Sequence, residues 1–433
     1  MRWPPPFRSL PNPAPVFAWS IYDLANQSFQ LLINTLLFPL FFTGVIVGDD
    51  DRGRALWFQL SALGLLLVVV LSPFVGALAD QRAWKRELLL ASGAVCAGLT
   101  LALGLIQPGQ AWLAAAAYLI AAVACGLGEN GLGSFLPEIS TPSTVGRVSA
   151  IGWTTSYIGA LLLLGITAAF TLGFGREDAS EMRPMLVFAG LWFAAGMIPS
   201  VLWLRERATP QVGAGTPLVR GVLARLAQCA RDTARFRQLT RFFIAFAVYS
   251  AGTLTMIFGL GLIGDRLGFG MHKLILMASV IAVTAGVAAA IAGRVQDRFG
   301  HVRTISVFLI LWIVATLAMA GAEWVSVPEP VYWAVSGVIG AALGGIGTSS
   351  RAIVGAFTPE PRAGEFFGLW GMIYKLAGMV GVLAFGKFSA LAGQPIALLV
   401  VAAMFGLGLA LLLRVDEKAG IAEAIVAPCD PGE

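Results

Sequence analysis

The stretch GALADQR, residues 76–82, decides the fold, because GRVQDR at residues 293–298 repeats its Gly and its Asp 217 positions later. Each copy follows an apolar run and opens a short basic loop. The same offset relates two pairs of aromatic residues, Trp153 and Tyr157 in the first copy, Trp370 and Tyr374 in the second. One shared offset of about half the 433-residue length indicates two homologous halves. Many membrane transporters are built from such internal repeats.

The composition is that of a membrane protein. Hydrophobic residues make up 58% of the chain and charged residues 12%, with a mean hydropathy of +0.81, whereas soluble domains carry about 25% charged residues. A helix needs roughly 20 apolar residues to cross a bilayer. We therefore predict an all-α integral membrane fold with twelve spans, six in each half, at residues 17–42, 56–78, 88–106, 111–135, 148–172, 185–204, 239–263, 274–293, 304–321, 331–350, 366–385 and 396–413.

These spans divide the chain into segments. We predict a cytoplasmic tail at 1–16, an N-terminal six-helix lobe at 17–204, a linker at 205–238, a C-terminal six-helix lobe at 239–414 and a cytoplasmic tail at 415–433. No small-residue cleavage site accompanies the first span, so we expect a retained helix rather than a signal peptide. The linker's basic part, residues 218–238, is either an amphipathic helix on anionic headgroups or a solvated connection.

Basic residues gather in the loops on the side of both termini, which predicts that both termini are cytoplasmic in the plasma (inner) membrane. The net charge of +5 then reflects topology, and we expect no nucleic-acid partner.

The two repeated stretches resemble the loop signature of the major facilitator superfamily, Gly-x-x-x-Asp-(x)-Arg followed by basic residues, where the residue in parentheses is present in the first copy and absent from the second. The resemblance implies that Asp80 latches the cytoplasmic side shut against basic residues and the N-terminus of the eleventh helix, where partial positive charge favours a carboxylate. The alternative is an Asp that ends a helix among topology-setting charges. The residues implied in this cytoplasmic gate are Gly76, Asp80, Arg82, Lys85, Arg86, Gly293, Asp297 and Arg298.

Further motifs resemble the vacuole-effluxer-like family of that superfamily, the autophagy-related amino-acid effluxers. YDLANQSF at 22–29 resembles its Tyr-Asp-x-Ala-Asn-x-x-Phe opening, and three more matches are FLPEI at 135–139, GRVS at 146–149 and EFFGL at 365–369. The chain departs from the family at 249–252, which read YSAG where members often read Tyr-Asn-Asp-Gly, and at Tyr374-Lys375, where members often read Gly-Lys. The resemblance implies two pseudo-symmetric lobes and transport of an amino-acid-like solute, in the direction of efflux.

Three ionisable residues lie inside predicted spans: Asp23, Glu129 and Lys375. A charge there costs at least ~2.5 kcal/mol and usually marks a pathway or a pair. We expect Asp23 or Glu129 to couple protons and Lys375 to hold an anionic substrate group. The alternatives are an Asp23 at the membrane interface, a Glu129 in a loop beyond a short fourth span, and a Lys375 paired structurally with a carboxylate. The glycines around Glu129 also predict a break in that helix.

Polar and aromatic neighbours complete the predicted substrate and coupling site: Asn26, Gln27, Asn130, Tyr157 and Tyr374. For each aromatic residue, packing against neighbouring helices is the alternative. We expect His272 and His301 to lie in loops, outside the proton path.

Other function classes lack their motifs. The chain has no phosphate-cradling Gly-x-x-x-x-Gly-Lys-Ser/Thr loop, and no clustered catalytic or metal-ligating set, so we expect no enzyme, cofactor or metal. We predict a monomeric secondary active transporter that moves a small solute by alternating access with proton coupling. The alternatives are a facilitator without ion coupling and a receptor or scaffold of transporter ancestry.

Overall fold

The computed structural model describes residues 7–10, 12–140, 145–176, 178–207, 235–325, 327–358 and 363–426. These residues contain helices and no strands. Twelve helical segments in this described part are long and apolar enough to cross a membrane. The predicted all-α fold with twelve spans is therefore confirmed.

The first half of the chain supplies six of these spans. The first span, Pro13–Val47, is a composite of α1 (Pro13–Gln27), the π-helix η2 (Ser28–Leu36), α2 (Leu37–Leu40) and the π-helix η3 (Phe41–Val47). The other described helices of this half are α3 (Asp50–Arg82), α4 (Lys85–Leu103), α5 (Ala111–Ser134), the short α6 (Leu136–Ile139), α7 (Val145–Phe174) and α8 (Arg183–Trp203), with 3-10 turns η1 (Phe7–Ser9) and η4 (Ala179–Met182).

The second half supplies the other six spans and a short terminal helix. The spans are α10 (Arg237–Arg266), α11 (Met271–Phe299), α12 (His301–Ala322), α13 (Glu329–Ala356), α14 (Ala363–Ala392) and α15 (Gln394–Leu412), and the terminal helix is α16 (Glu417–Val426).

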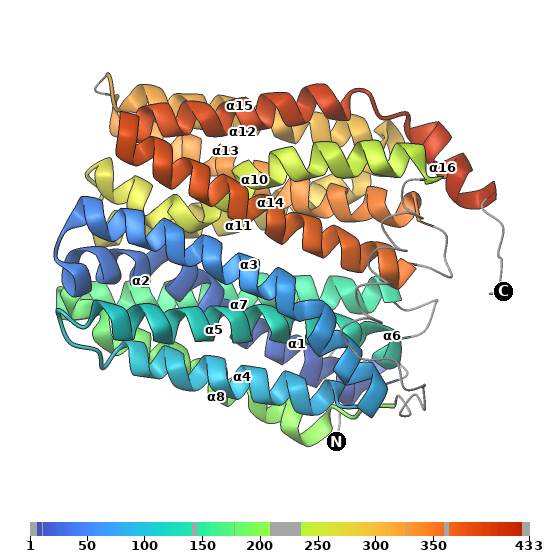
Figure 1. The fold of residues 1–433 in the computed structure, drawn as a ribbon, viewed down its shortest axis with the longest axis horizontal. Helices are drawn as coiled ribbons and strands as arrows, with labels where there is room; N and C mark the ends of the chain where they lie inside the picture. The colour runs from blue at the N-terminus through green and yellow to red at the C-terminus, as the bar shows by residue number, and fades with distance from the viewer. Residues whose placement is uncertain are drawn as a thin grey trace. The chain divides into compact units, whose positions relative to one another are not determined.

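The helices form two compact units. The first comprises the described residues of Met1–Val222 and Phe258–Leu276, and the second those of Leu223–Ile257 and Met277–Glu433. The last turns of α10 therefore belong to the first unit, although the rest of that helix belongs to the second. Within the first unit α4 lies beside α5 and α8, and within the second α12 lies beside α13 and α15 (Figure 1).

Local sequence explains where several helices begin and end. The side chain of Asp49 accepts a hydrogen bond from the backbone N–H of Arg52 and so caps α3, while two acidic residues in its first turn complement the helix dipole. Helix α3 ends at Ala83 in the left-handed conformation, with φ 53°. Helix α12 begins after Gly300, whose φ of 90° suits a residue without a side chain.

Glycines let helix α1 pack at backbone distance in the first unit. A Cβ at Gly159 of α7 would lie 2.7 Å from the carbonyl oxygen of Leu24, and a Cβ at Gly196 of α8 would collide with Ala25. Small residues at such crossings allow close approach of helices. Helix α1, which carries the predicted polar site, is thus held against both α7 and α8.

Two sequence expectations are wrong. Helix α5 is continuous from Ala111 to Ser134, so Glu129 lies neither in a loop nor at a helix break. Gly128 serves packing instead, because a Cβ there would lie 3.1 Å from the hydroxyl of Tyr22. His272 and His301 occupy the first turns of α11 and α12 and not loops.

Candidate functional site

The first unit contains a side-chain network centred on the Glu129 carboxylate. Glu129 is half-buried on α5, and its Oε1 accepts hydrogen bonds from Gln30 Nε2 at 2.5 Å and from Asn26 Nδ2 at 3.3 Å. Hydrogen bonds to an ionised group are shorter and stronger than neutral ones. The first span thereby supplies two amide donors to one carboxylate.

A chain of hydrogen bonds orients Gln30. Its Oε1 accepts from Asn34 Nδ2 at 2.8 Å, and Asn34 Oδ1 accepts from the hydroxyl of Tyr118 at 3.2 Å. The hydroxyl of Ser61 lies 3.5 Å from that of Tyr118. Each amide oxygen accepts a hydrogen bond from the residue farther from Glu129, so each amide NH2 group is directed toward Glu129. All donors in this series of hydrogen bonds therefore point toward the carboxylate.

The π-helix η2 places Gln30 and Asn34 on this network. The hydroxyl of Thr35 donates to the backbone carbonyl of Gln30 at 2.9 Å, five residues earlier. Wide helical turns of this kind are rare and frequently occur at functional sites. Cys125, one turn before Glu129, donates its thiol to Asn26 Oδ1 at 3.1 Å.

The other predicted residues of the first span have separate partners. Gln27 Nε2 donates to the hydroxyl of Ser156 on α7 at 2.6 Å, whereas Asp23 is half-buried one turn earlier on α1. Asn130 is exposed and donates to the hydroxyl of Ser72 on α3 at 2.6 Å, so it points away from its neighbour Glu129. Tyr157 packs against Trp153, with ring centroids 6.0 Å apart. The structure thus brings Asn26 to Glu129 but turns Asn130 elsewhere.

In the second unit an aromatic stack surrounds the predicted residue Tyr374. Its ring stacks on that of Trp370 at 6.3 Å between centroids, and both stack on the buried Phe246 at 5.9 and 5.4 Å. The guanidinium of Arg351 lies 6.0 Å from the centroid of Trp370. Lys375, which follows Tyr374, is half-buried.

The basic residues after the first repeated stretch tie helix ends within the first unit. Lys85 Nζ pairs with Glu138 Oε1 at 3.0 Å. Arg86 donates to the carbonyls of Val201 at 2.6 Å and Leu204 at 2.8 Å, and so satisfies the C-terminus of α8. Burial raises the pKa of the nearby Glu206, against a hydrogen bond from the Arg86 backbone that lowers it.

The structure describes fewer contacts for the other residues of the predicted gate than for Lys85 and Arg86. Arg82 lies over the ring of Trp84, 4.7 Å from its centroid, and Arg298 is exposed. A Cβ at Gly76 or Gly293 would meet no atom within 4 Å. The side chains of Asp80 and Asp297 lie outside the described ones. Within the described residues, no group of three His, Cys, Asp or Glu side chains is arranged to hold a metal ion.

The family of the chain follows from comparison with known proteins. A family model described as "Vacuole effluxer Atg22 like" matches residues 45–425. The chain belongs to this family. Among curated relatives, the MFS-type transporter YxiO of Bacillus subtilis is 23% identical over 93% of this chain and 94% of its own length. Autophagy-related protein 22-1 of Aspergillus niger is 25% identical over 64% of this chain, which spans about half (48%) of the fungal protein.

Solved structures show the same fold at low sequence identity. The nucleoside transporter NupG and a D-xylose-proton symporter each superpose with a TM-score of 0.69, at 13% and 15% identity, over 93% and 94% of this chain and 99% and 98% of theirs. A POT family transporter solved with 5-aminolevulinic acid gives a TM-score of 0.70 at 12% identity, over 94% and 96%. The Atg22-like chain thus has the major facilitator fold and is a membrane transporter of that type.

Sequence reasoning missed most of the network around Glu129. Gln30, Asn34, Tyr118 and Cys125 were not predicted site residues. A signal was present, because Asn26, Gln30 and Asn34 recur every four residues in a mostly apolar span, and residues four apart share one face of a helix. Tyr118 carried no signal, since an aromatic residue within an apolar span usually packs against neighbouring helices.

Proposed function

We propose that this Atg22-like protein is a secondary active transporter that moves a small, amino-acid-like solute by alternating access, with Glu129 as the proton-coupling group. The observation that carries the proposal is the 2.5 Å hydrogen bond between Gln30 Nε2 and Glu129 Oε1 inside the membrane-spanning region. An ionisable residue within a span is costly and usually marks an ion or substrate pathway.

Amide partners suit a carboxylate that gains and loses a proton. An amide offers a donor on one side and an acceptor on the other. Gln30 and Asn26 therefore donate to the ionised carboxylate. Either amide can accept from the protonated form by turning over, which releases the donor that its oxygen now holds, Asn34 for Gln30 and Cys125 for Asn26. A guanidinium, which only donates, serves the ionised form alone.

The remaining predicted residues have supporting roles in this proposal. Lys375, beside the stack of Phe246, Trp370 and Tyr374, holds an anionic group of the solute. Asp23 is the second candidate for proton coupling, because it lies half-buried on the same span as Asn26. Solute export fits the family description, which names a vacuole effluxer. Asp80 and Asp297, in the last turns of α3 and α11, act in the cytoplasmic gate, and both termini lie in the cytoplasm.

The test uses purified full-length protein in liposomes that contain a pH-sensitive dye. A gradient of mixed amino acids is imposed, and proton flux is compared between wild type and Glu129→Gln. We expect solute-dependent proton flux that disappears in Glu129→Gln, while exchange of labelled solute across the membrane persists. Asp23→Asn, tested beside it, decides between the two carboxylates.

Glu181→Gln is the matched control, because Glu181 pairs with Arg176 at 2.8 Å near a helix start, away from the network. This control should retain the flux. Solute exchange without proton flux in wild type would favour a facilitator. Failure of wild type to move any solute tried, including other metabolites and with sodium in place of protons, would favour a receptor or scaffold.

A further inference from the structure

The last turns of α10 are docked on the first unit by two close backbone contacts. The indole N–H of the buried Trp57 on α3 donates to the carbonyl of Phe258 at 3.1 Å. Gly261 lies against the π-helix η2, where an added Cβ would be 2.8 Å from the carbonyl oxygen of Thr35 and 3.0 Å from that of Leu36. A helix whose earlier turns belong to the second unit therefore ends in the packing of the first.

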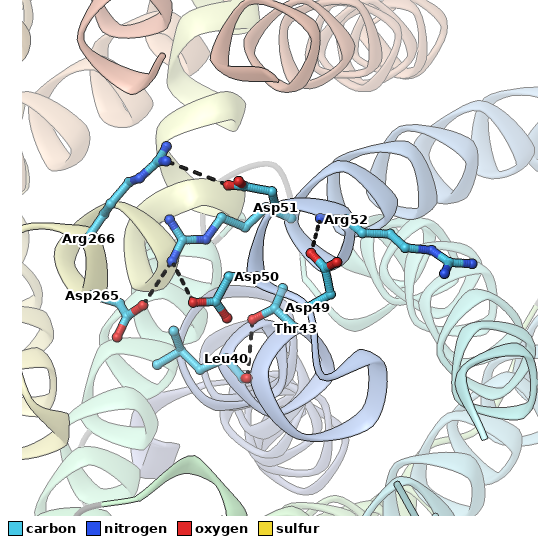
Figure 2. Close-up of polar contacts among 9 residues, drawn as sticks. Leu40, Thr43, Asp49, Asp50, Asp51, Arg52, Asp265 and Arg266 are labelled. Carbon is cyan, nitrogen blue, oxygen red and sulfur yellow. Dashed lines mark hydrogen bonds and ion pairs between the residues drawn. The ribbon is translucent and has the colours of Figure 1, made fainter. Parts of the chain in front are cut away.

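Charged side chains reinforce this docking at the end of the helix (Figure 2). Arg54 of α3 pairs with Asp265 of α10 at 3.2 Å, and Arg266 pairs with Asp51 at 3.6 Å. The Arg54 side chain is only 14% exposed, whereas Asp265 is 44% exposed. Leaving a buried charge without a partner costs more free energy than leaving an exposed charge without one. The ion pair therefore matters more to Arg54 than to Asp265.

Arg54 has a second carboxylate on its own helix. Asp50 Oδ2 lies 3.7 Å from the same Nη2 atom that contacts Asp265. Because Asp50 is one helical turn away, it stays beside Arg54 whether or not α10 is docked. When Asp265 moves away, Arg54 thus still has a carboxylate beside it. Releasing α10 therefore costs less free energy than it would if the buried guanidinium were left without a partner.

We propose that Arg54 is a reversible latch, which exchanges Asp265 for Asp50 when the end of α10 leaves the first unit during the transport cycle. The inference rests on the alternating access proposed above, but the latch itself is a property of the first unit. A cavity of about 380 Å³, lined by Gly48, Asp49, Asp50, Asp51, Arg54 and Arg266, opens beside the pair. Salt ions therefore reach the latch and weaken it.

Hydrogen–deuterium exchange of residues 258–266 in the full-length protein tests the latch without any transported solute. Exchange reports local opening, and an ion pair of this exposure is expected to change it about two- to fivefold. We expect Asp265→Asn and Arg54→Gln each to speed exchange by that factor. The exchanged pair Arg54→Asp with Asp265→Arg should bring the rate back toward wild type. Unchanged exchange in both single variants would overturn the proposal.

The matched control is Arg52→Gln, because the Arg52 side chain points away from Asp265 and Arg266 (Figure 2). It removes the same charge from the same end of α3 and should leave exchange unaltered. Raising the salt from about 0.1 M to about 1 M shortens the Debye length from about 10 Å to about 3 Å. This should speed exchange more in wild type than in Asp265→Asn, which keeps only the Arg266–Asp51 pair of the two that dock α10, and an equal response in both proteins would contradict the latch.

Gly261→Ala provides a variant that leaves every charge in place. Its added methyl group should push α10 off Thr35 and Leu36 and speed exchange by about tenfold or more. If exchange follows these expectations but wild type moves no solute, the latch stands and the proposed transport function fails. If the protein transports solute but the charge substitutions leave the hydrogen–deuterium exchange rate unchanged, the proposed transport function is supported and the latch is refuted.

Discussion

Glu417 of the terminal helix α16 binds His301, the first residue of α12, through both the backbone and the side chain. Glu417 Oε1 accepts from the backbone N–H at 2.9 Å and from ring Nδ1 at 2.7 Å, while its Oε2 accepts from the backbone N–H of Val302 at 3.0 Å. A carboxylate from another helix thus serves as the N-cap of α12. Gly300 leaves room for it, since a Cβ there would lie 2.9 Å from Oε2.

Glu417→Gln should lower the thermal stability and flatten its dependence on acid pH. Burial alone raises the pKa of Glu417, but the hydrogen bonds from His301 and Val302 outweigh it and lower the pKa from 4.5 to about 2. The ionised carboxylate therefore stabilises the fold above its unfolded pKa, and this contribution is lost as the pH falls from 4.5 toward about 2.

We expect a loss of about 1 kcal/mol at neutral pH, less than usual for a charged hydrogen bond because the pair is partly exposed. Thermal unfolding of the purified protein at several pH values measures it. The control is Lys418→Gln on the exposed side of α16. Parallel pH curves for wild type and Glu417→Gln would refute the prediction.

Gln30→Ala should impair proton coupling. The change removes the 2.5 Å donor to Glu129 and leaves Asn34 without its acceptor. A hydrogen bond to a charged group contributes about 1.5–3 kcal/mol, so we expect the pH gradient to drive roughly tenfold less solute accumulation. Proteoliposome flux measures this, with Gln59→Ala on the exposed face of α3 as the control. Wild-type accumulation in Gln30→Ala would show that Glu129 does not depend on this donor.

Gly344→Ala and Gly347→Ala, three residues apart on α13, should have opposite effects. A Cβ at Gly344 would collide with the backbone of Ala285 on α11, whereas one at Gly347 would meet no atom within 4 Å. Overpacking costs about 1–3 kcal/mol, and replacing an unhindered helical Gly by Ala gains up to about 1 kcal/mol. In thermal unfolding, the midpoint of Gly344→Ala should therefore lie below that of wild type and the midpoint of Gly347→Ala above it. Equal midpoints would mean that the helices separate easily at Gly344.

Reversing the Lys85–Glu138 pair should restore only part of the stability that either single change loses, because a lysine at position 138 restores the ion pair but cannot accept a hydrogen bond from a backbone N–H. Both side chains are largely buried, and Glu138 also accepts from the backbone N–H of Arg207 at 2.9 Å. Lys85→Met should therefore cost about 2 kcal/mol, between the values for exposed and for fully buried pairs. Glu87→Gln, in the exposed pair with Arg86, is the control and should change stability little. A Lys85→Glu, Glu138→Lys protein no more stable than the single variants would argue against a direct pair.

The sequence predicted the spans well because the bilayer requires only properties that can be read from a contiguous stretch of sequence. A spanning helix satisfies its own backbone hydrogen bonds and needs only length and apolar composition, both of which can be counted. The family was equally accessible, since YDLANQSF and the repeated loop are contiguous motifs. Glu129 and Asn26 were predicted site residues for the same reason, because polar groups within an apolar span stand out.

Contacts between distant segments were decided only by the tertiary structure. Gln30 meets Glu129 across 99 residues, and Arg54 meets Asp265 across 211. Each contact depends on how helices are rotated about their axes, and composition does not fix that rotation. It is set by close packing, such as Gly159 on Leu24 and Gly261 on Thr35. The sequence by itself determined which segments enter the membrane, whereas packing determined which of their polar side chains face one another.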